Sequence, residues 1–207
     1  MEFYTYIGRV KKTGVLRFLS NMEYMRSIER TLRRAKFPIW MTQGFHPRIK
    51  LSFPIALATG TVDLTGFFEF RMVEDIPKDR IKNLIKEFNL KAPKGLSMTN
   101  IWKVEKSGVL SNVIEYYEFK IIIKRSDISD YHMNKNDLNV IDLDFVKLKD
   151  FVVVEYIIAR NKITKPENVL DNLISNTVNK TFYIPICYKA FDKNFNNIVK
   201  TIEQFSV

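Results

Sequence analysis

The residues best suited to chemistry lie between positions 43 and 50, in the sequence QGFHPRIK. Gly44 and Pro47 predict a tight turn, because glycine accepts a positive φ and proline fixes its own φ. The polar and aromatic side chains that this turn presents are Gln43, Phe45, His46, Arg48 and Lys50. Two cations and a histidine so close in sequence favour a phosphate ligand, with Gln43 as a donor to a base edge or to backbone.

His46 and Phe45 admit more specific interpretations. His46 is a weak candidate for a general base acting on a ribose hydroxyl. Phe45 is a candidate stacking platform for a base. The alternatives are a purely structural turn with an exposed histidine, or a histidine that caps a strand.

A helix with an arginine-rich face precedes this turn. Ser20 followed by Glu23 is a capping-box pattern, which predicts a helix over residues 20–36. The apolar residues at helical spacing, which we expect to face the core, are Met22, Met25, Ile28, Leu32 and Ala35. The arginines within roughly a 100° arc on the opposite side are Arg26, Arg30, Arg33 and Arg34. Such an array suits a phosphate backbone, whereas the alternative is a solvated helix face.

Positive charge is concentrated in the N-terminal part of the chain. Residues 1–60 hold 11 basic and 3 acidic side chains, whereas the remainder holds 22 basic and 20 acidic ones. Arg17, in a strand predicted over residues 15–19, belongs to the predicted nucleic-acid-binding set. The asymmetry favours a polyanionic partner, with a solubility-enhancing surface as the alternative.

The composition excludes several classes of protein and site. Cys187 is the single cysteine, so neither an internal disulfide nor a cysteine-ligated zinc or iron–sulfur site is expected. With two histidines and scattered carboxylates, we predict no metal and no cofactor. The N-terminus lacks a signal-peptide pattern, and no apolar run is long enough to span a bilayer. We therefore expect a soluble cytoplasmic protein that does not contact a membrane.

The order of predicted elements favours an α+β fold with a ferredoxin-like β-α-β-β-α-β arrangement in the first half. Its predicted strands cover residues 15–19, 49–53, 66–73 and 95–104, and its helices residues 20–36 and 77–88. In the second half we predict strands over residues 113–124, 151–159 and 182–191 and a helix over residues 166–175. This pattern predicts a degenerate ferredoxin-like half.

A boundary and an irregular insertion complete the predicted organisation. Residues 106–112, with Gly108 and two serines, separate a basic domain over residues 1–106 from a second α+β domain over residues 113–207. Residues 126–150 are rich in Asp, Asn and Lys, which predicts an irregular insertion.

The first 75 or so residues resemble the radical SAM-associated (radical SAM-linked) proteins, a bacterial family of uncharacterised function. The matching stretches are residues 16–20 (LRFLS), the pair Arg33-Arg34, residues 43–48 (QGFHPR) and residues 50–53 (KLSF). Ile49 departs from the proline usual in the family. The resemblance implies a radical SAM protein as partner, a link to ribosome and RNA metabolism, and an iron–sulfur cluster that would belong to that partner.

Three functions are therefore weighed. The first is an RNA-binding accessory protein, without catalytic activity of its own, that works with a radical SAM partner in tRNA or rRNA modification. The second is a metal-independent endoribonuclease like the CRISPR repeat-processing enzymes. No glycine follows Gly108, which argues against the glycine-rich loop near the C-terminus that those enzymes usually carry. The third is a protein–protein adaptor that docks an acidic partner without RNA.

Overall fold

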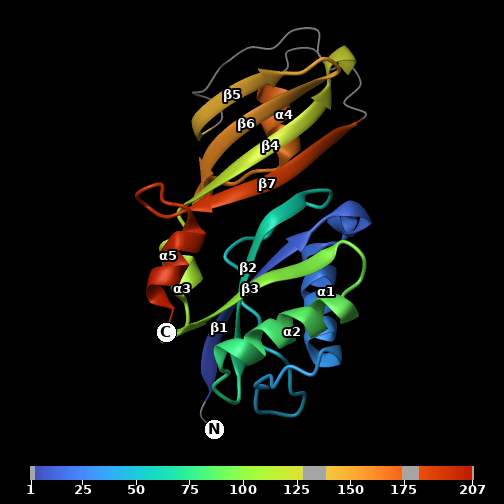
Figure 1. Cartoon of the computed structure of the whole chain (residues 1–207). Helices are drawn as coiled ribbons and strands as arrows, with labels where there is room; N and C mark the ends of the chain where they lie inside the picture. The colour runs from blue at the N-terminus through green and yellow to red at the C-terminus, as the bar shows by residue number, and fades with distance from the viewer. Residues whose placement is uncertain (1–2, 128–138, 174–181, 207) are drawn as a thin grey trace.

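The computed structural model describes residues 3–127, 139–173 and 182–206 as a mixed α+β structure built on one seven-stranded sheet (Figure 1). The strands are β1 (Tyr4–Lys12), β2 (Val62–Met72), β3 (Leu96–Val104), β4 (Tyr116–Lys124), β5 (Val140–Lys147), β6 (Phe151–Ala159) and β7 (Tyr183–Phe191). The helices are α1 (Asn21–Arg34), α2 (Lys78–Lys91), α3 (Val109–Val113), α4 (Pro166–Leu173) and α5 (Ile198–Phe205), with short 3-10 turns η1 (Gly14–Phe18), η2 (Arg125–Asp127) and η3 (Arg160–Lys162). The order of strands across the sheet is β3-β1-β2-β7-β4-β6-β5.

In the first half, β1 lies between β2 and β3 and pairs antiparallel with both. Helices α1 and α2 lie together on one face of these strands (Figure 1). Successive residues of β2 alternate between the faces, so Phe68 and Phe70 pack with the helices while Phe67 packs on the other side. Both faces are covered, which explains why consecutive residues of β2 are buried.

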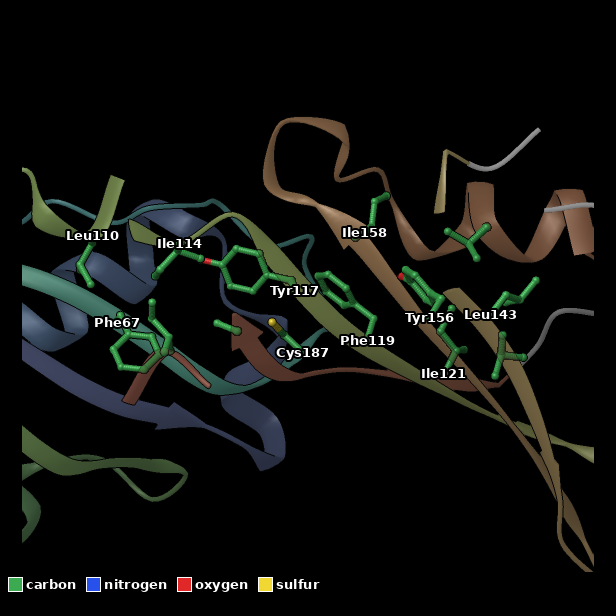
Figure 2. Close-up of a cluster of buried hydrophobic side chains, with 14 of the residues drawn as sticks. Phe67, Leu110, Ile114, Tyr117, Phe119, Ile121, Leu143, Tyr156, Ile158 and Cys187 are labelled. Atoms are coloured by element: carbon green, nitrogen blue, oxygen red, sulfur yellow. The ribbon is translucent and has the colours of Figure 1, made fainter. Parts of the chain in front are cut away.

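In the second half, β4 lies between β6 and β7 and pairs antiparallel with both. Side chains from these strands and from α4 form one hydrophobic cluster that includes Phe119, Tyr156 and Leu170. Figure 2 shows that this cluster continues from Leu143, through Tyr117 and Cys187, to Phe67 and Leu110. This cluster therefore spans both halves, whereas a second cluster, which includes Phe68 and Phe70, belongs to the first half alone.

The halves meet where β2 pairs with β7. This is the one parallel pairing among the named strands, and it joins Val62 to Ile186 and Asp63 to Cys187. A second link comes from Glu69, whose carboxylate accepts hydrogen bonds from the backbone of Gly108 (2.7 Å) and Leu110 (2.8 Å). Glu69 therefore fastens the connection between the halves, including the start of α3, to β2.

The order of the described strands differs from that of the predicted pair of ferredoxin-like halves, so that arrangement is not confirmed. The predicted strand over residues 15–19 is instead η1, which begins at Gly14 with a φ of 58°. The first strand is β1, which the analysis of the sequence did not predict. The predicted strand over residues 49–53 is reduced to isolated bridges, Met41 with Ile49 and Ser52 with Glu69. Prolines at positions 47 and 54 flank it and remove backbone donors that a continuous strand needs.

The other predicted helices and strands have counterparts in the structure. The helices over residues 20–36, 77–88 and 166–175 correspond to α1, α2 and α4, and the remaining strands to β2, β3, β4, β6 and β7. Part of the predicted irregular insertion is ordered: β5 lies within it, at the edge of the sheet, whereas residues 128–138 lie outside the described residues. The division into domains over residues 1–106 and 113–207 stays a prediction. Among the described helices, none is long and apolar enough to cross a membrane.

Candidate nucleic-acid interface

The helix that carries the arginines is fixed at its start by a capping box. The Ser20 hydroxyl accepts a hydrogen bond from the backbone of Glu23 (3.3 Å), and the Glu23 carboxylate accepts one from the backbone of Ser20 (2.9 Å). Hydrogen bonds from Ser20 lower the pKa of Glu23. This pairing satisfies backbone donors that the helix itself leaves free, so α1 begins where the sequence predicts.

The buried face of α1 differs slightly from the predicted stripe. Its buried residues are Tyr24, Ile28, Thr31 and Leu32, followed by Ala35 directly after the helix. Met22, predicted to face the core, is 59% exposed. The stripe is rotated because the hydroxyaromatic Tyr24, rather than a methionine, fills the first buried position.

The four predicted arginines of α1, Arg26, Arg30, Arg33 and Arg34, are all exposed. Arg33 forms an ion pair with Glu29 at 3.0 Å, and the Nε of Arg34 donates to the Arg30 carbonyl at 3.3 Å. An exposed pair of this kind contributes little to stability. The arginine face is therefore accessible to a ligand.

The loop after α1 is closed by two hydrogen bonds at its base. The backbone of Thr42 donates to the Arg48 carbonyl (2.9 Å), and the backbone of Arg48 donates to the Thr42 hydroxyl (3.0 Å). Gly44 has a φ of 140°, a conformation that other residues rarely adopt. At the tip, the Phe45 side chain is 96% exposed and meets the His46 ring edge-on, with centroids 5.1 Å apart.

Helix α1 and this loop enclose a surface groove of about 760 Å³, which we call the basic groove. Its basic lining residues are Arg26, Arg30 and Arg33 from the helix and Arg48 and Lys50 from the loop. Among the described residues that line it, Glu29 is the one carboxylate. Two segments that the sequence presents separately thus direct five cations toward one depression.

The other predicted site residues lie elsewhere. Arg34, Gln43, Phe45 and His46 are exposed on the same two segments but do not line the basic groove. Arg17 lies on η1, with its guanidinium 4.6 Å from the centroid of the Phe18 ring, and lines a different depression. Among the described residues, none is hydrogen-bonded to the His46 ring, so no side chain orients it as a base.

A buried polar cluster, which the sequence analysis did not predict, lies at the junction of β2 and β7. Asp63 is 5% exposed, and one of its oxygens accepts hydrogen bonds from the backbone (2.9 Å) and the hydroxyl (3.4 Å) of Thr65. Thr65 also shares a hydrogen bond of 3.1 Å with Cys187, which is fully buried. Lys12 is 2% exposed, and its ammonium lies 4.9 Å from the centroid of the Tyr24 ring. We call these five residues the junction cluster.

Burial governs ionisation in the junction cluster. It raises the pKa of Asp63 to about 6, against the opposing effects of the Thr65 hydrogen bonds and the Lys12 charge. Burial also lowers the pKa of Lys12 and raises that of the Cys187 thiol. A cysteine held in its thiol form is a poor nucleophile, so Cys187 acts in the junction cluster as a small buried side chain.

A small cavity of about 20 Å³ adjoins the junction cluster, with room for one water molecule. The side chains of Tyr24, Asp63 and Tyr117 line it. In the described part of the chain, the hydroxyls of Tyr24 and Tyr117 have no hydrogen-bond partner. Gly66 is necessary beside it, because a Cβ there would lie 2.9 Å from both Asp63 Oδ2 and the Tyr24 hydroxyl.

A family model matches residues 6–177 of the chain, which include the basic groove and all of the junction cluster except Cys187. The chain belongs to the family described as uncharacterized protein conserved in bacteria (DUF2344). No curated protein matches it. The match confirms a bacterial family of uncharacterised proteins, while the link to radical SAM proteins stays a prediction. Across residues 3–127, 139–173 and 182–206, no group of three or more His, Cys, Asp or Glu side chains is placed to hold a metal ion.

Proposed function

We propose that this protein is an RNA-binding accessory protein that holds RNA in its basic groove and leaves the chemistry to a partner. The observation that carries the proposal is the convergence of Arg26, Arg30, Arg33, Arg48 and Lys50 on one depression with a single acidic lining residue. Guanidinium groups bind phosphate through paired hydrogen bonds, and each neutralised phosphate releases counterions. The resemblance to radical SAM-associated proteins supplies the class of partner, a radical SAM protein acting on tRNA or rRNA.

The volume and the positive lining of the basic groove support a nucleic acid over a flat acidic protein surface. A depression of about 760 Å³ lined by arginines accommodates a backbone that enters it. The exposed Phe45 and His46 rings beside it add aromatic surface for bases. We expect no strand cleavage by the protein alone, since the His46 ring is not oriented by another side chain in the described residues.

The test is the salt dependence of RNA binding. We expect Arg26→Glu/Arg30→Glu/Arg33→Glu to weaken binding of bulk tRNA by at least about tenfold at low salt. The slope of log K against log salt is negative, and its magnitude should decrease by roughly 2, because three phosphate contacts disappear. Fluorescence anisotropy with labelled tRNA at several salt concentrations measures both quantities.

Helix α2 offers a matched control. Lys78→Glu/Lys82→Glu/Lys86→Glu changes the net charge equally on another exposed helix. If both triple variants weaken binding alike, the effect is one of net charge and the basic groove is not the binding site. If the wild-type protein does not bind tRNA or rRNA fragments, RNA binding itself is refuted and an acidic protein partner becomes the better hypothesis.

A further inference from the structure

A second depression of about 800 Å³ lies between the two halves of the molecule. From the first half, η1 and residues 57–60 line it, and from the second half the starts of α4 and β7. This volume falls within the range of small-molecule and nucleotide sites. We call it the inter-half groove.

Two exposed aromatic rings face this groove from opposite halves. Phe18 is 57% exposed and Phe182 is 51% exposed, and both line the depression. Exposed phenylalanines are costly to hydrate, so a pair of them in one depression favours a ligand with an apolar flat face. Purine and pyrimidine bases have such faces.

Cations accompany the rings. The Arg17 guanidinium lies 4.6 Å from the Phe18 centroid, which fixes its direction, and Lys165 lines the same groove. The Nε of Arg17 is buried without a hydrogen-bond partner in the described residues. The lining carboxylate, Glu167, is already engaged by the Tyr183 hydroxyl at 3.0 Å. This hydrogen bond leaves the carboxylate charged, so the lining carries two cations, Arg17 and Lys165, against one anion, a net charge of +1.

The wall of the groove is held in place by backbone hydrogen bonds. The backbone of Gly60 donates to the Arg17 carbonyl at 2.7 Å, and that of Thr61 donates to the Ala58 carbonyl at 3.1 Å. The first bond joins residues 57–60 to η1, and the second closes the turn that carries them. A wall that is formed before binding reduces the entropy lost when a ligand enters.

We propose that the inter-half groove binds one nucleotide of single-stranded RNA, with its base against Phe18 and Phe182 and its phosphate at Arg17 and Lys165. The proposal rests on the RNA-binding function proposed above and names the form of RNA that the protein selects. At the start of α1, Asn21 lines the inter-half groove and the next residue, Met22, lines the basic groove. The proposal therefore has one RNA strand of several nucleotides contact both grooves.

The test uses a short single-stranded RNA with one 2-aminopurine, a base whose fluorescence falls when it stacks. We expect the wild-type protein to quench this fluorescence on binding. Phe18→Ala/Phe182→Ala should abolish the quenching and weaken binding roughly tenfold, as expected for the loss of base stacking. The salt slope should stay unchanged, because no phosphate contact is removed.

Phe205→Ala, which removes a 51% exposed ring from α5 outside the groove, is the matched control and should bind like the wild type. Thermal unfolding of each variant establishes that the fold is intact. If Phe18→Ala/Phe182→Ala binds and quenches like the wild type, the inter-half site is refuted while the basic groove stands. If the wild type binds no RNA, both proposals fail together.

Discussion

The basic groove and the junction cluster both bring cations together, but they do so in opposite surroundings. The arginines of the basic groove are exposed, and one of them is paired with a carboxylate at 3.0 Å. Lys12 in the junction cluster is 2% exposed, and the carboxylate of Asp63 lies in the same buried cluster. A charge that keeps its water is available to a ligand, whereas a buried charge is committed to the fold.

This difference changes how the charge asymmetry of the sequence is to be understood. The 11 basic residues among positions 1–60 include Lys12 and also Arg9, whose guanidinium donates to the Leu64 carbonyl at 3.3 Å. Burial lowers the pKa of both side chains. Counting them with the arginines of α1 overstates the positive charge that a polyanion meets.

The contrast between the basic groove and the junction cluster is tested most strongly by removing Lys12, the buried cation. We expect Lys12→Met to reduce the free energy of unfolding by about 2–3 kcal/mol, because it leaves the buried Asp63 carboxylate without a nearby positive charge that lowers its pKa. Urea unfolding at pH 7 measures the change. Lys11→Met, on the same strand but half-buried, should change stability by less than about 0.5 kcal/mol. Equal effects would mean that Lys12 does not compensate Asp63.

The pH dependence of stability tests the ionisation of Asp63 itself. Burial raises the pKa of Asp63 to about 6 from 3.8, so the folded state takes up a proton before the unfolded state does. The free energy of unfolding of the wild type, relative to Asp63→Asn, should therefore rise by up to about 2–3 kcal/mol as the pH falls from 7 to 4. Urea titrations across this range give the difference. A flat trend would show that folding leaves the pKa of Asp63 unchanged, and an opposite trend that the fold stabilises the anion.

The link between the halves depends on a third buried charge. Glu69→Gln should destabilise the protein by about 1–2 kcal/mol, because the amide keeps one acceptor oxygen and turns a donor toward the other backbone N–H of Gly108 or Leu110. Glu105→Gln, at an exposed position nearby, is the control and should have little effect. Thermal unfolding of both variants makes the comparison. If Glu69→Gln leaves thermal unfolding unchanged, the connection between the halves is held by packing alone.

The smallest effect on stability is expected at the tip of the loop. Phe45→Ala should change the free energy of unfolding by less than about 0.5 kcal/mol, because the ring is 96% exposed. Its RNA affinity should nevertheless fall about fivefold if a base stacks on the ring. Leu90→Ala, at a 65% exposed position on α2, controls for loss of exposed apolar surface. Unchanged affinity would remove Phe45 from the interface.

Local patterns predicted α1 well, because its start depends on two residues three positions apart. The Ser20–Glu23 capping box is a local interaction that can be recognised directly from the sequence. β1 was missed because both of its faces are covered, so Thr5, Tyr6 and Ile7 are buried in succession and no alternation appears. The predicted strand over residues 49–53 failed because flanking prolines outweigh the apolar pattern.

The candidate site, like the fold, was predicted from the sequence only where it depends on local patterns. The two segments of the basic groove were each predicted, but their convergence on one depression depends on how the loop folds back along α1. The junction cluster requires Lys12, Asp63 and Cys187 to meet from three strands that are far apart in the sequence but adjacent in the sheet. One signal was present: Asp63 stands between Val62 and Leu64, in a segment with the composition of a buried strand.

The position of β7 in the sheet has a consequence for synthesis on the ribosome. β7 lies between β2 and β4 although it follows both of them in the chain, so the continuous sheet closes only after residue 183 has emerged. Until then β2 and β4 each present an unpaired edge, the kind of surface that promotes aggregation. Maturation therefore depends on the late insertion of one strand between two segments that have already been translated.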